Sequence, residues 1–313
     1  MSKVGTSIVA QLELDQILSK VLPVILTFGL GYFLKKTRVF TFDNAETFLK
    51  LVFHISLPAL IFVSIVKARL SLDLAYLPII CMIVVLVTLP IVYSVGRRFR
   101  LRGPSLGAFV VGPMITNTTF VVPFLITTFG REAIALLSIF DVGNNIMIYT
   151  LVYYFANRYG TGKGAENALK IIARSPLLYA LLIGLFLNAA KAPLPPISLN
   201  FFQGLGDMTT PLVMLSLGIY FNPMVVRVGP TFAAIFIRIA IGFVIALLLT
   251  FLFGIEGLSR AVVLVACSAP VGFTTLTFSA IAGLDTEFAA SCVSYSILIG
   301  LLTTPLLIFF LIR

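Results

Sequence analysis

Hydroxyl and amide side chains are concentrated at two points within otherwise apolar stretches of this sequence. The first group is Thr116, Asn117, Thr118 and Thr119, in the stretch 105–128. The second, with its neighbouring proline and glycine, is Pro270, Gly272, Thr274 and Thr275, in the stretch 259–282. Threonine and asparagine both donate and accept hydrogen bonds. Their position in apolar surroundings predicts that they line a site for a small polar molecule.

Proline accompanies both groups, at Pro113 and Pro123 around the first and at Pro270 within the second. Proline removes a backbone donor and clashes with the preceding turn, so it interrupts a helix. Inside a membrane, backbone freed in this way is tolerated only where it is buried or lines a cavity. Two interrupted helices therefore predict a midplane site with helix ends facing the ligand. The alternative is that these residues only kink and pack the helices.

Four ionisable side chains inside apolar stretches are candidates for ion coupling or charge pairing: Asp141, Asp207, Arg238 and His54. A charge at the bilayer centre costs roughly 2.5–3.5 kcal/mol, so it seldom lies there without a role. Counting along the helices places Asp207 and Arg238 about 12–14 Å deep, near the midplane. For Arg238 the alternative is snorkelling to the headgroups. For His54 it is a neutral ring packed against a carbonyl group.

The sequence contains no set of residues spaced to bind a metal ion. Cys81, Cys267 and Cys292 lie in apolar stretches at no ligand spacing, and the chain has one histidine. These residues support neither a disulfide framework nor a zinc site. There is no His-Glu-x-x-His and no glycine-rich phosphate loop. We therefore expect no metal, no cofactor and no enzymatic activity.

The composition is that of a polytopic membrane protein. Of the 313 residues, 59% are hydrophobic and 11% charged, and the mean hydropathy is +1.10. That leaves too little polar surface for a soluble globule. A helix needs about 20 apolar residues to cross a bilayer. The stretches that approach or reach this length are 15–34, 45–66, 72–96, 105–128, 133–156, 175–190, 198–221, 230–253, 259–282 and 287–311. They predict an all-α protein with ten transmembrane helices.

An internal duplication organises these ten stretches. Pro23, Pro58, Asn117 and Gly130 recur at one constant spacing as Pro176, Pro211, Pro270 and Gly283, and Gly31 recurs as Gly184. Each copy contains five apolar stretches, so the second copy must run upside down relative to the first. Inverted repeats of this kind are typical of secondary transporters. We therefore divide the chain into a first repeat (1–157), a linker (158–175) that includes a candidate interfacial helix over 166–174, and a second repeat (176–313).

The positive charges predict the orientation. If the N-terminus faces outward, most of the 22 lysine and arginine residues lie in cytoplasmic loops. Lysine and arginine accumulate on the cytoplasmic side, so both termini are expected outside a multi-pass protein of the cell membrane. The net charge of +10 arises from short loops at the ends of the helices and gives no indication of nucleic-acid binding.

Several short motifs resemble the auxin efflux carrier family, which includes plant auxin carriers and bacterial permeases for malonate-like acids. They are Asn144-Asn145 with 148–151, 215–221, Ala269-Pro270 with 283–285, and 297–308. The resemblance covers the whole chain. It implies two inverted five-helix repeats, with broken helices four and nine crossing in a transport domain that moves like an elevator against a scaffold of spans one, two, six and seven. It also implies a homodimer. A weaker resemblance to bile acid sodium symporters implies a similar fold.

Together these patterns predict a transporter of a small organic anion, such as an indole or dicarboxylic acid. Asn144 and Asn145 are expected to line the site with the two polar groups. A carboxyl group at Asp141 or Asp207 can carry a proton, whereas no acidic residue lies in the break of span nine. This favours proton coupling or uniport over the alternative, a sodium symporter. A ligand-sensing receptor would use the same pocket without transport, and an intramembrane enzyme is a more distant alternative.

Overall fold

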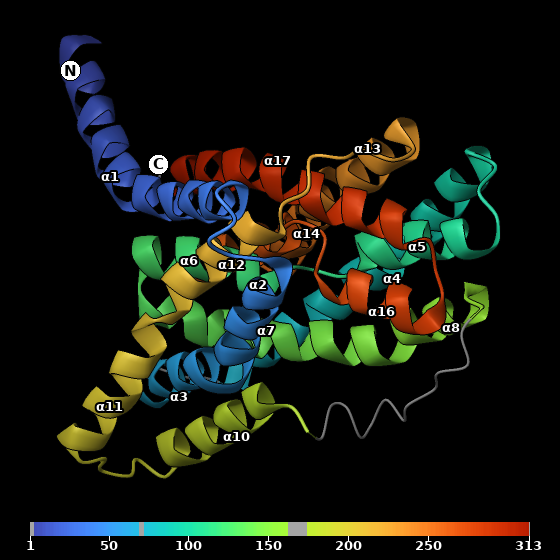
Figure 1. The fold of residues 1–313 in the computed structure, drawn as a ribbon. Helices are drawn as coiled ribbons and strands as arrows, with labels where there is room; N and C mark the ends of the chain where they lie inside the picture. Colours follow the sequence, from blue (N-terminus) through green and yellow to red (C-terminus); the bar gives the residue numbers. More distant parts are fainter. Residues whose placement is uncertain (1–2, 69–71, 162–173, 313) are drawn as a thin grey trace.

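The computed structural model describes residues 3–68, 72–161 and 174–312, and these residues are almost entirely helical. No β-strand occurs among them, apart from one isolated antiparallel bridge between Thr116 and Val271. The expected interfacial helix over 166–174 lies outside the described residues except for Arg174. Figure 1 shows the helices as a bundle, in which the first half of α1 projects beyond the rest.

The described residues of the first half form eight α-helices, with two π turns and one 3₁₀ turn between them. They are α1 (Lys3–Lys36), α2 (Phe42–Leu51), η1 (Val52–Ser56), α3 (Leu57–Lys67), η2 (Leu72–Ala75), α4 (Tyr76–Arg98), α5 (Gly103–Met114), α6 (Thr118–Phe129), α7 (Arg131–Met147), η3 (Ile148–Val152) and α8 (Tyr153–Tyr159).

The second half contains a similar series of elements. They are α10 (Pro176–Ala189), α11 (Pro196–Asp207), α12 (Thr209–Tyr220), α13 (Val228–Phe236), η4 (Ile237–Ile241), α14 (Gly242–Leu252), α15 (Gly257–Cys267), α16 (Thr274–Ala282) and α17 (Thr286–Ile312).

Five helical segments among the described residues are long and apolar enough to cross a membrane. They are Phe42–Lys67, Tyr76–Arg98, Arg131–Tyr159, Val228–Leu252 and Thr286–Ile312. Three shorter apolar helices are Thr118–Phe129, Pro176–Ala189 and Gly257–Cys267. The first and third of the shorter helices are halves of the interrupted stretches 105–128 and 259–282. The structure is therefore an all-α membrane protein with two prominent helix breaks.

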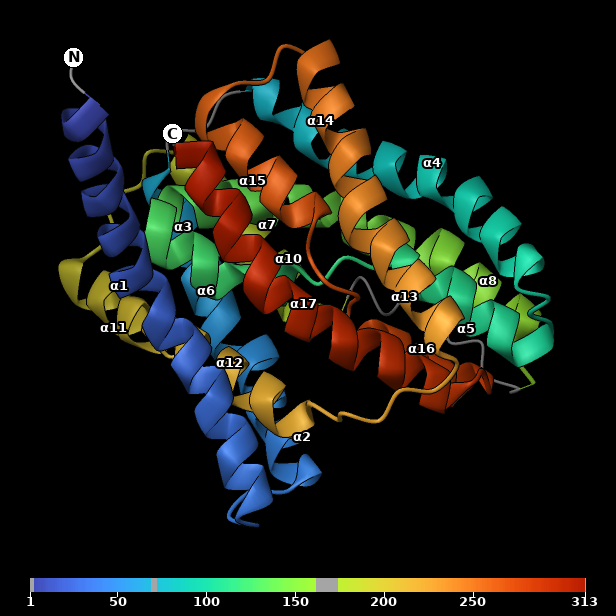
Figure 2. The same ribbon diagram turned by 90° about the horizontal axis from the view of Figure 1, so that it is seen from above.

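The helices form two packed groups. In Figure 2, α1 and α12 of one group lie side by side, whereas α4, α5 and α8 of the other group lie at the opposite end of the view. In the first helix group, α1 packs on α12, α12 on α2, and α3 on α10 and α11. In the second helix group, α7 contacts α4, α6 and α15, while α5 contacts α8 and α17. The two groups meet mainly where α3 lies against α7 and α12 against α6.

Glycine allows α1 and α12 to approach closely in the first helix group. A Cβ atom on Gly31 would collide with the backbone carbonyl of Leu215, and one on Gly218 would collide with that of Phe28. Glycine has no Cβ, so two helix backbones can lie in direct contact at such positions. The pair α1 and α12 is thereby held at a distance that only small residues permit.

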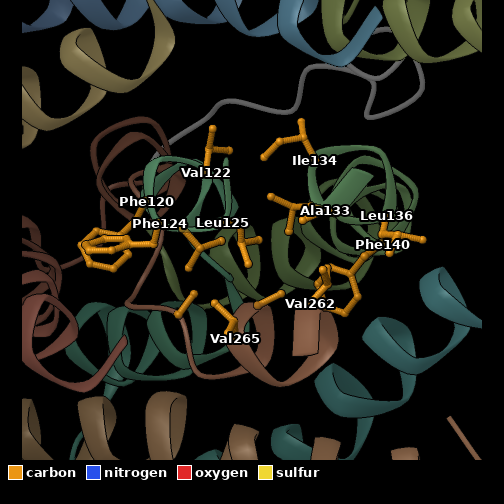
Figure 3. Close-up of a cluster of buried hydrophobic side chains, with 14 of the residues drawn as sticks. Phe120, Val122, Phe124, Leu125, Ala133, Ile134, Leu136, Phe140, Val262 and Val265 are labelled. Atoms are coloured by element: carbon orange, nitrogen blue, oxygen red, sulfur yellow. The ribbon is translucent and has the colours of Figure 1, made fainter. Parts of the chain in front are cut away.

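A layer of aliphatic and aromatic side chains joins α6, α7 and α15 in the second helix group (Figure 3). Phe120 and Phe124 of α6, Phe140 of α7, and Val262 and Val265 of α15 are all fully buried. Two of these helices, α6 and α15, come from different halves of the chain. The layer therefore fixes the helices that flank the two breaks relative to one another.

Candidate functional site

The two helix breaks meet at one place in the structure. Helix α5 ends at Met114 and α6 begins at Thr118, whereas α15 ends at Cys267 and α16 begins at Thr274. The intervening backbones run antiparallel: the amide of Asn117 donates to the carbonyl of Pro270 (3.1 Å), and that of Gly272 donates to the carbonyl of Ile115 (3.0 Å). We call residues 115–117 together with 268–273 the crossing. Each broken segment thus satisfies part of the other's exposed backbone.

The side chains of Asn117 and Ser296 add hydrogen bonds to the crossing. Asn117 accepts a hydrogen bond from the amide of Phe120 (3.1 Å) and donates to the carbonyl of Val271 (3.4 Å). Asn117 is therefore the N-cap of α6, and its side chain also joins the two halves of the chain by a hydrogen bond. Ser296 of α17 accepts a bond from the amide of Val271 (3.0 Å). Gly272 is required because a Cβ atom there would collide with the side chain of Ile115.

A cavity of about 740 Å³ lies beside the crossing. We call it the central cavity. From the predicted site it is lined by Thr116, Asn117, Thr118, Thr119, Asp141, Asn144, Asn145, Gly272, Thr274 and His54. Its volume is within the range of about 300–1,000 Å³ that is usual for small-molecule sites. The structure therefore brings together ten of the residues chosen from sequence, from both halves of the chain.

Asp141 organises the polar side of the central cavity. Its carboxylate accepts from the side-chain amide of Asn144 (2.8 Å) and from that of Asn145 (2.7 Å). Asn144 also donates to the carbonyl of Thr116 at the crossing (3.3 Å), and its own oxygen is buried without a hydrogen-bond partner among the described residues. Asp141 thus fixes the side-chain amides of two residues that line the cavity.

Four predicted site residues do not line the central cavity. Pro270 lies in the crossing and Thr275 in the first turn of α16, directly after the crossing, and both are buried. Asp207 is at the end of α11, with its side chain 59% exposed, and pairs with Arg131 (2.8 Å) rather than facing the cavity. Arg238 is not among the residues that line the cavity and donates to the carbonyls of Pro113 and Cys267. It is 2% exposed, so it does not snorkel toward the headgroups.

His54 lines the central cavity from the π turn η1. Its Nδ1 lies 2.9 Å from the carbonyl oxygen of Lys50, so one ring nitrogen is occupied by the backbone of its own helix. This is the arrangement of a ring packed against a carbonyl group. His54 as a whole residue is exposed.

Sequence reasoning missed the aromatic and aliphatic lining of the central cavity. The missed residues include Phe53, Leu57, Ile61, Tyr149, Tyr153, Phe273 and Phe278. Tyr149 and Tyr153 follow Asp141 and Asn145 at intervals of four residues, so helical spacing alone could have placed them on the same face. Phe53, Leu57 and Ile61 come from the first helix group, so the cavity lies between the two groups.

The fold is that of a helical membrane protein with a cavity between two helix groups. The sequence pattern of the membrane transport protein family matches residues 16–308. The chain therefore belongs to this family, which is the auxin efflux carrier family that the short motifs resemble. It is therefore a membrane transporter.

Two archaeal relatives are similar over nearly their whole length. An uncharacterized transporter of Methanothermobacter thermautotrophicus is 28% identical over 291 residues, which cover 91% of this chain and 95% of the relative. An uncharacterized transporter of Methanocaldococcus jannaschii is 28% identical over 297 residues, which cover 91% of this chain and 96% of the relative.

Proposed function

We propose that this protein moves a small organic anion across the cell membrane through the central cavity. The observation that carries the proposal is the crossing, where α6 and α16 both begin beside the cavity. The N-terminal end of a helix carries about half a positive charge, which favours an anion. The aliphatic and aromatic lining suits an apolar body such as an indole ring or a short carbon chain. We do not propose that the protein chemically converts the bound compound.

The inverted repeat supports alternating access. In the proposed topology the spans are α1, α2–α3, α4, α5–α6 and α7–α8 in the first half, and α10, α11–α12, α13–α14, α15–α16 and α17 in the second. The central cavity is lined by both helix groups. If the second helix group slides as a body along the first, the crossing carries the ligand from one side to the other. The first group is then the scaffold and, by family resemblance, the dimer contact.

A two-stage experiment tests the proposed transport. Purified protein is first screened by thermal shift with indole-3-acetate, malonate and related acids. The acid that raises Tm most is then radiolabelled and its uptake into proteoliposomes is measured against protein-free liposomes. We expect saturable flux and recovery of the unchanged compound. Binding without flux would favour a ligand-sensing receptor, and recovery of a modified compound would favour an enzyme.

Coupling is proposed to be to protons, or absent. We expect uptake by the wild-type protein to change by less than about twofold, within ~0.4 kcal/mol, when sodium is replaced by potassium at constant ionic strength. The physical reason is the absence of a carboxylate in the break between α15 and α16. A steep and saturable sodium dependence would instead favour the sodium symporter.

Single cysteines test the proposed orientation of the chain. The native Cys81, Cys267 and Cys292 are buried and should not react with an impermeant maleimide. Both Thr161, which follows α8, and Ala190, which follows α10, are exposed. We expect Thr161→Cys to react only after the cells are permeabilised and Ala190→Cys to react in intact cells. The opposite pattern would reverse the orientation, and reaction of both in intact cells would contradict the inverted repeat.

A further inference from the structure

Arg238 is the largest fully buried side chain among the described residues. It lies on the π turn η4, within the long apolar segment Val228–Leu252. Its Nη1 donates to the carbonyl of Pro113 (3.2 Å) and its Nη2 to that of Cys267 (2.6 Å). None of the ion pairs between described residues involves it. A permanently charged group is therefore buried without a carboxylate partner.

Both acceptors of Arg238 lie in the last turn of a half-helix. Pro113 precedes the final residue of α5, and Cys267 is the final residue of α15. The C-terminal end of a helix carries about half a negative charge because its last carbonyl groups lack donors. Two such ends amount to about one negative charge. The single positive charge of the guanidinium matches this sum.

A glycine on the same helical segment leaves space for the guanidinium group of Arg238. A Cβ atom on Gly242, one turn after Arg238, would come within 2.6 Å of the carbonyl oxygen of Cys267 and 3.2 Å of Nη2 of Arg238. Glycine at this position leaves room for the arginine between α14 and the end of α15. The π turn and the glycine together place one charge against both helix ends.

Carbonyl groups at the ends of interrupted helices are also where transporters bind sodium ions. We propose that Arg238 is a built-in cation of the crossing, whose guanidinium takes the place of a bound alkali cation at the C-terminal ends of α5 and α15. The negative helix ends are then neutralised permanently, while the positive ends of α6 and α16 remain beside the central cavity. This inference deepens the proposed function because it explains a sodium-independent anion site.

Removal of Arg238 tests this directly, without a transported substrate. We expect Arg238→Ala to lower Tm, because two carbonyl ends lose their counter-charge. We further expect sodium or guanidinium chloride at millimolar concentration, compared with choline chloride at equal ionic strength, to raise the Tm of the variant. The rise should be about 2 °C at roughly tenfold above the dissociation constant. The wild-type Tm should not differ between sodium and choline.

Three variants serve as comparisons. Arg131→Ala removes an arginine outside the crossing and should gain no response to sodium or guanidinium. Arg238→Lys keeps a positive charge and should also remain unresponsive to sodium. Arg238→Gln keeps polarity without charge, so it should respond like Arg238→Ala and serves if the alanine variant cannot be purified.

Two results would overturn the inference. One is a saturable stabilisation of the wild-type protein by sodium, which would mean that the crossing still binds a cation. The other is a neutral variant whose Tm does not fall or does not respond to either cation. A failure to detect transport of any acid would count against the proposed function but would leave these Tm results unaffected.

Discussion

Replacing Asn117 with leucine is expected to abolish transport while the protein remains folded and monodisperse. The side chain of Asn117 caps α6 and donates to the carbonyl of Val271. Loss of an N-cap costs about 1 kcal/mol, and an unsatisfied buried carbonyl costs about 1–3 kcal/mol. The two losses sum to about 2–4 kcal/mol. If they destabilise the conformations that carry out transport by this amount, flux drops about 30- to 1,000-fold. Uptake into proteoliposomes at matched protein content measures it.

Two further variants separate the role of Asn117 from a general loss of an amide. Asn117→Asp keeps the oxygen that caps α6 but loses the donor to Val271, so it should retain more stability and still transport poorly. Asn157 lies in α8, is not among the residues that line the central cavity, and donates to the carbonyl of Tyr153 (2.9 Å). Asn157→Leu should therefore transport normally. Wild-type flux in Asn117→Leu would mean that the break is only a structural kink.

The second large effect is expected for Asp141→Asn. An amide has a single acceptor oxygen, so it cannot accept from Asn144 and Asn145 at once without placing one donor against another. A hydrogen bond to a charged group contributes about 1.5–3 kcal/mol, so loss of one should slow flux about 10- to 100-fold. Any pH dependence of wild-type flux between pH 5 and pH 8 should disappear if Asp141 carries the proton.

Asp207→Asn is the matched control for this prediction. Its partner Arg131 is 2.8 Å away, but the Asp207 side chain is 59% exposed. Exposed ion pairs contribute about 0–1 kcal/mol, so flux should change less than about fivefold and should keep its pH dependence. If Asp207→Asn abolished the pH dependence and Asp141→Asn did not, the proton site would have to be reassigned to the ion pair.

The helix breaks could be predicted from sequence because their cause is local. Proline and glycine act on their own backbone, and two such interruptions at matching repeat positions indicate one shared site. The polar residues beside them were found for the same reason. One face of α7 and η3 carries Asp141, Asn145 and Tyr149 at four-residue spacing. The sequence analysis identified Asp141 and Asn145 but not Tyr149, although the spacing is visible in the sequence.

The surroundings of the buried charges could not be predicted in this way. Counting residues along a helix gave Asp207 and Arg238 similar depths, yet one pairs with Arg131 in an exposed position and the other is buried against two helix ends. Depth depends on position along one helix, whereas a charge's partner depends on how helices from both halves of the chain pack. The π turns add to the difficulty because they rotate the following residues and are not evident from composition.

The bonding between the two breaks has a consequence for biosynthesis. Asn117 and the carbonyl that it contacts are separated by 154 positions in the chain. At about 5–20 residues per second, a ribosome takes roughly 8–30 s to make that interval. During this time the first break is in the membrane without its partner, with polar backbone groups exposed. The nascent first half must therefore be sheltered from lipid by the insertion machinery until the second half arrives, and a truncated product would be a target for quality-control proteolysis.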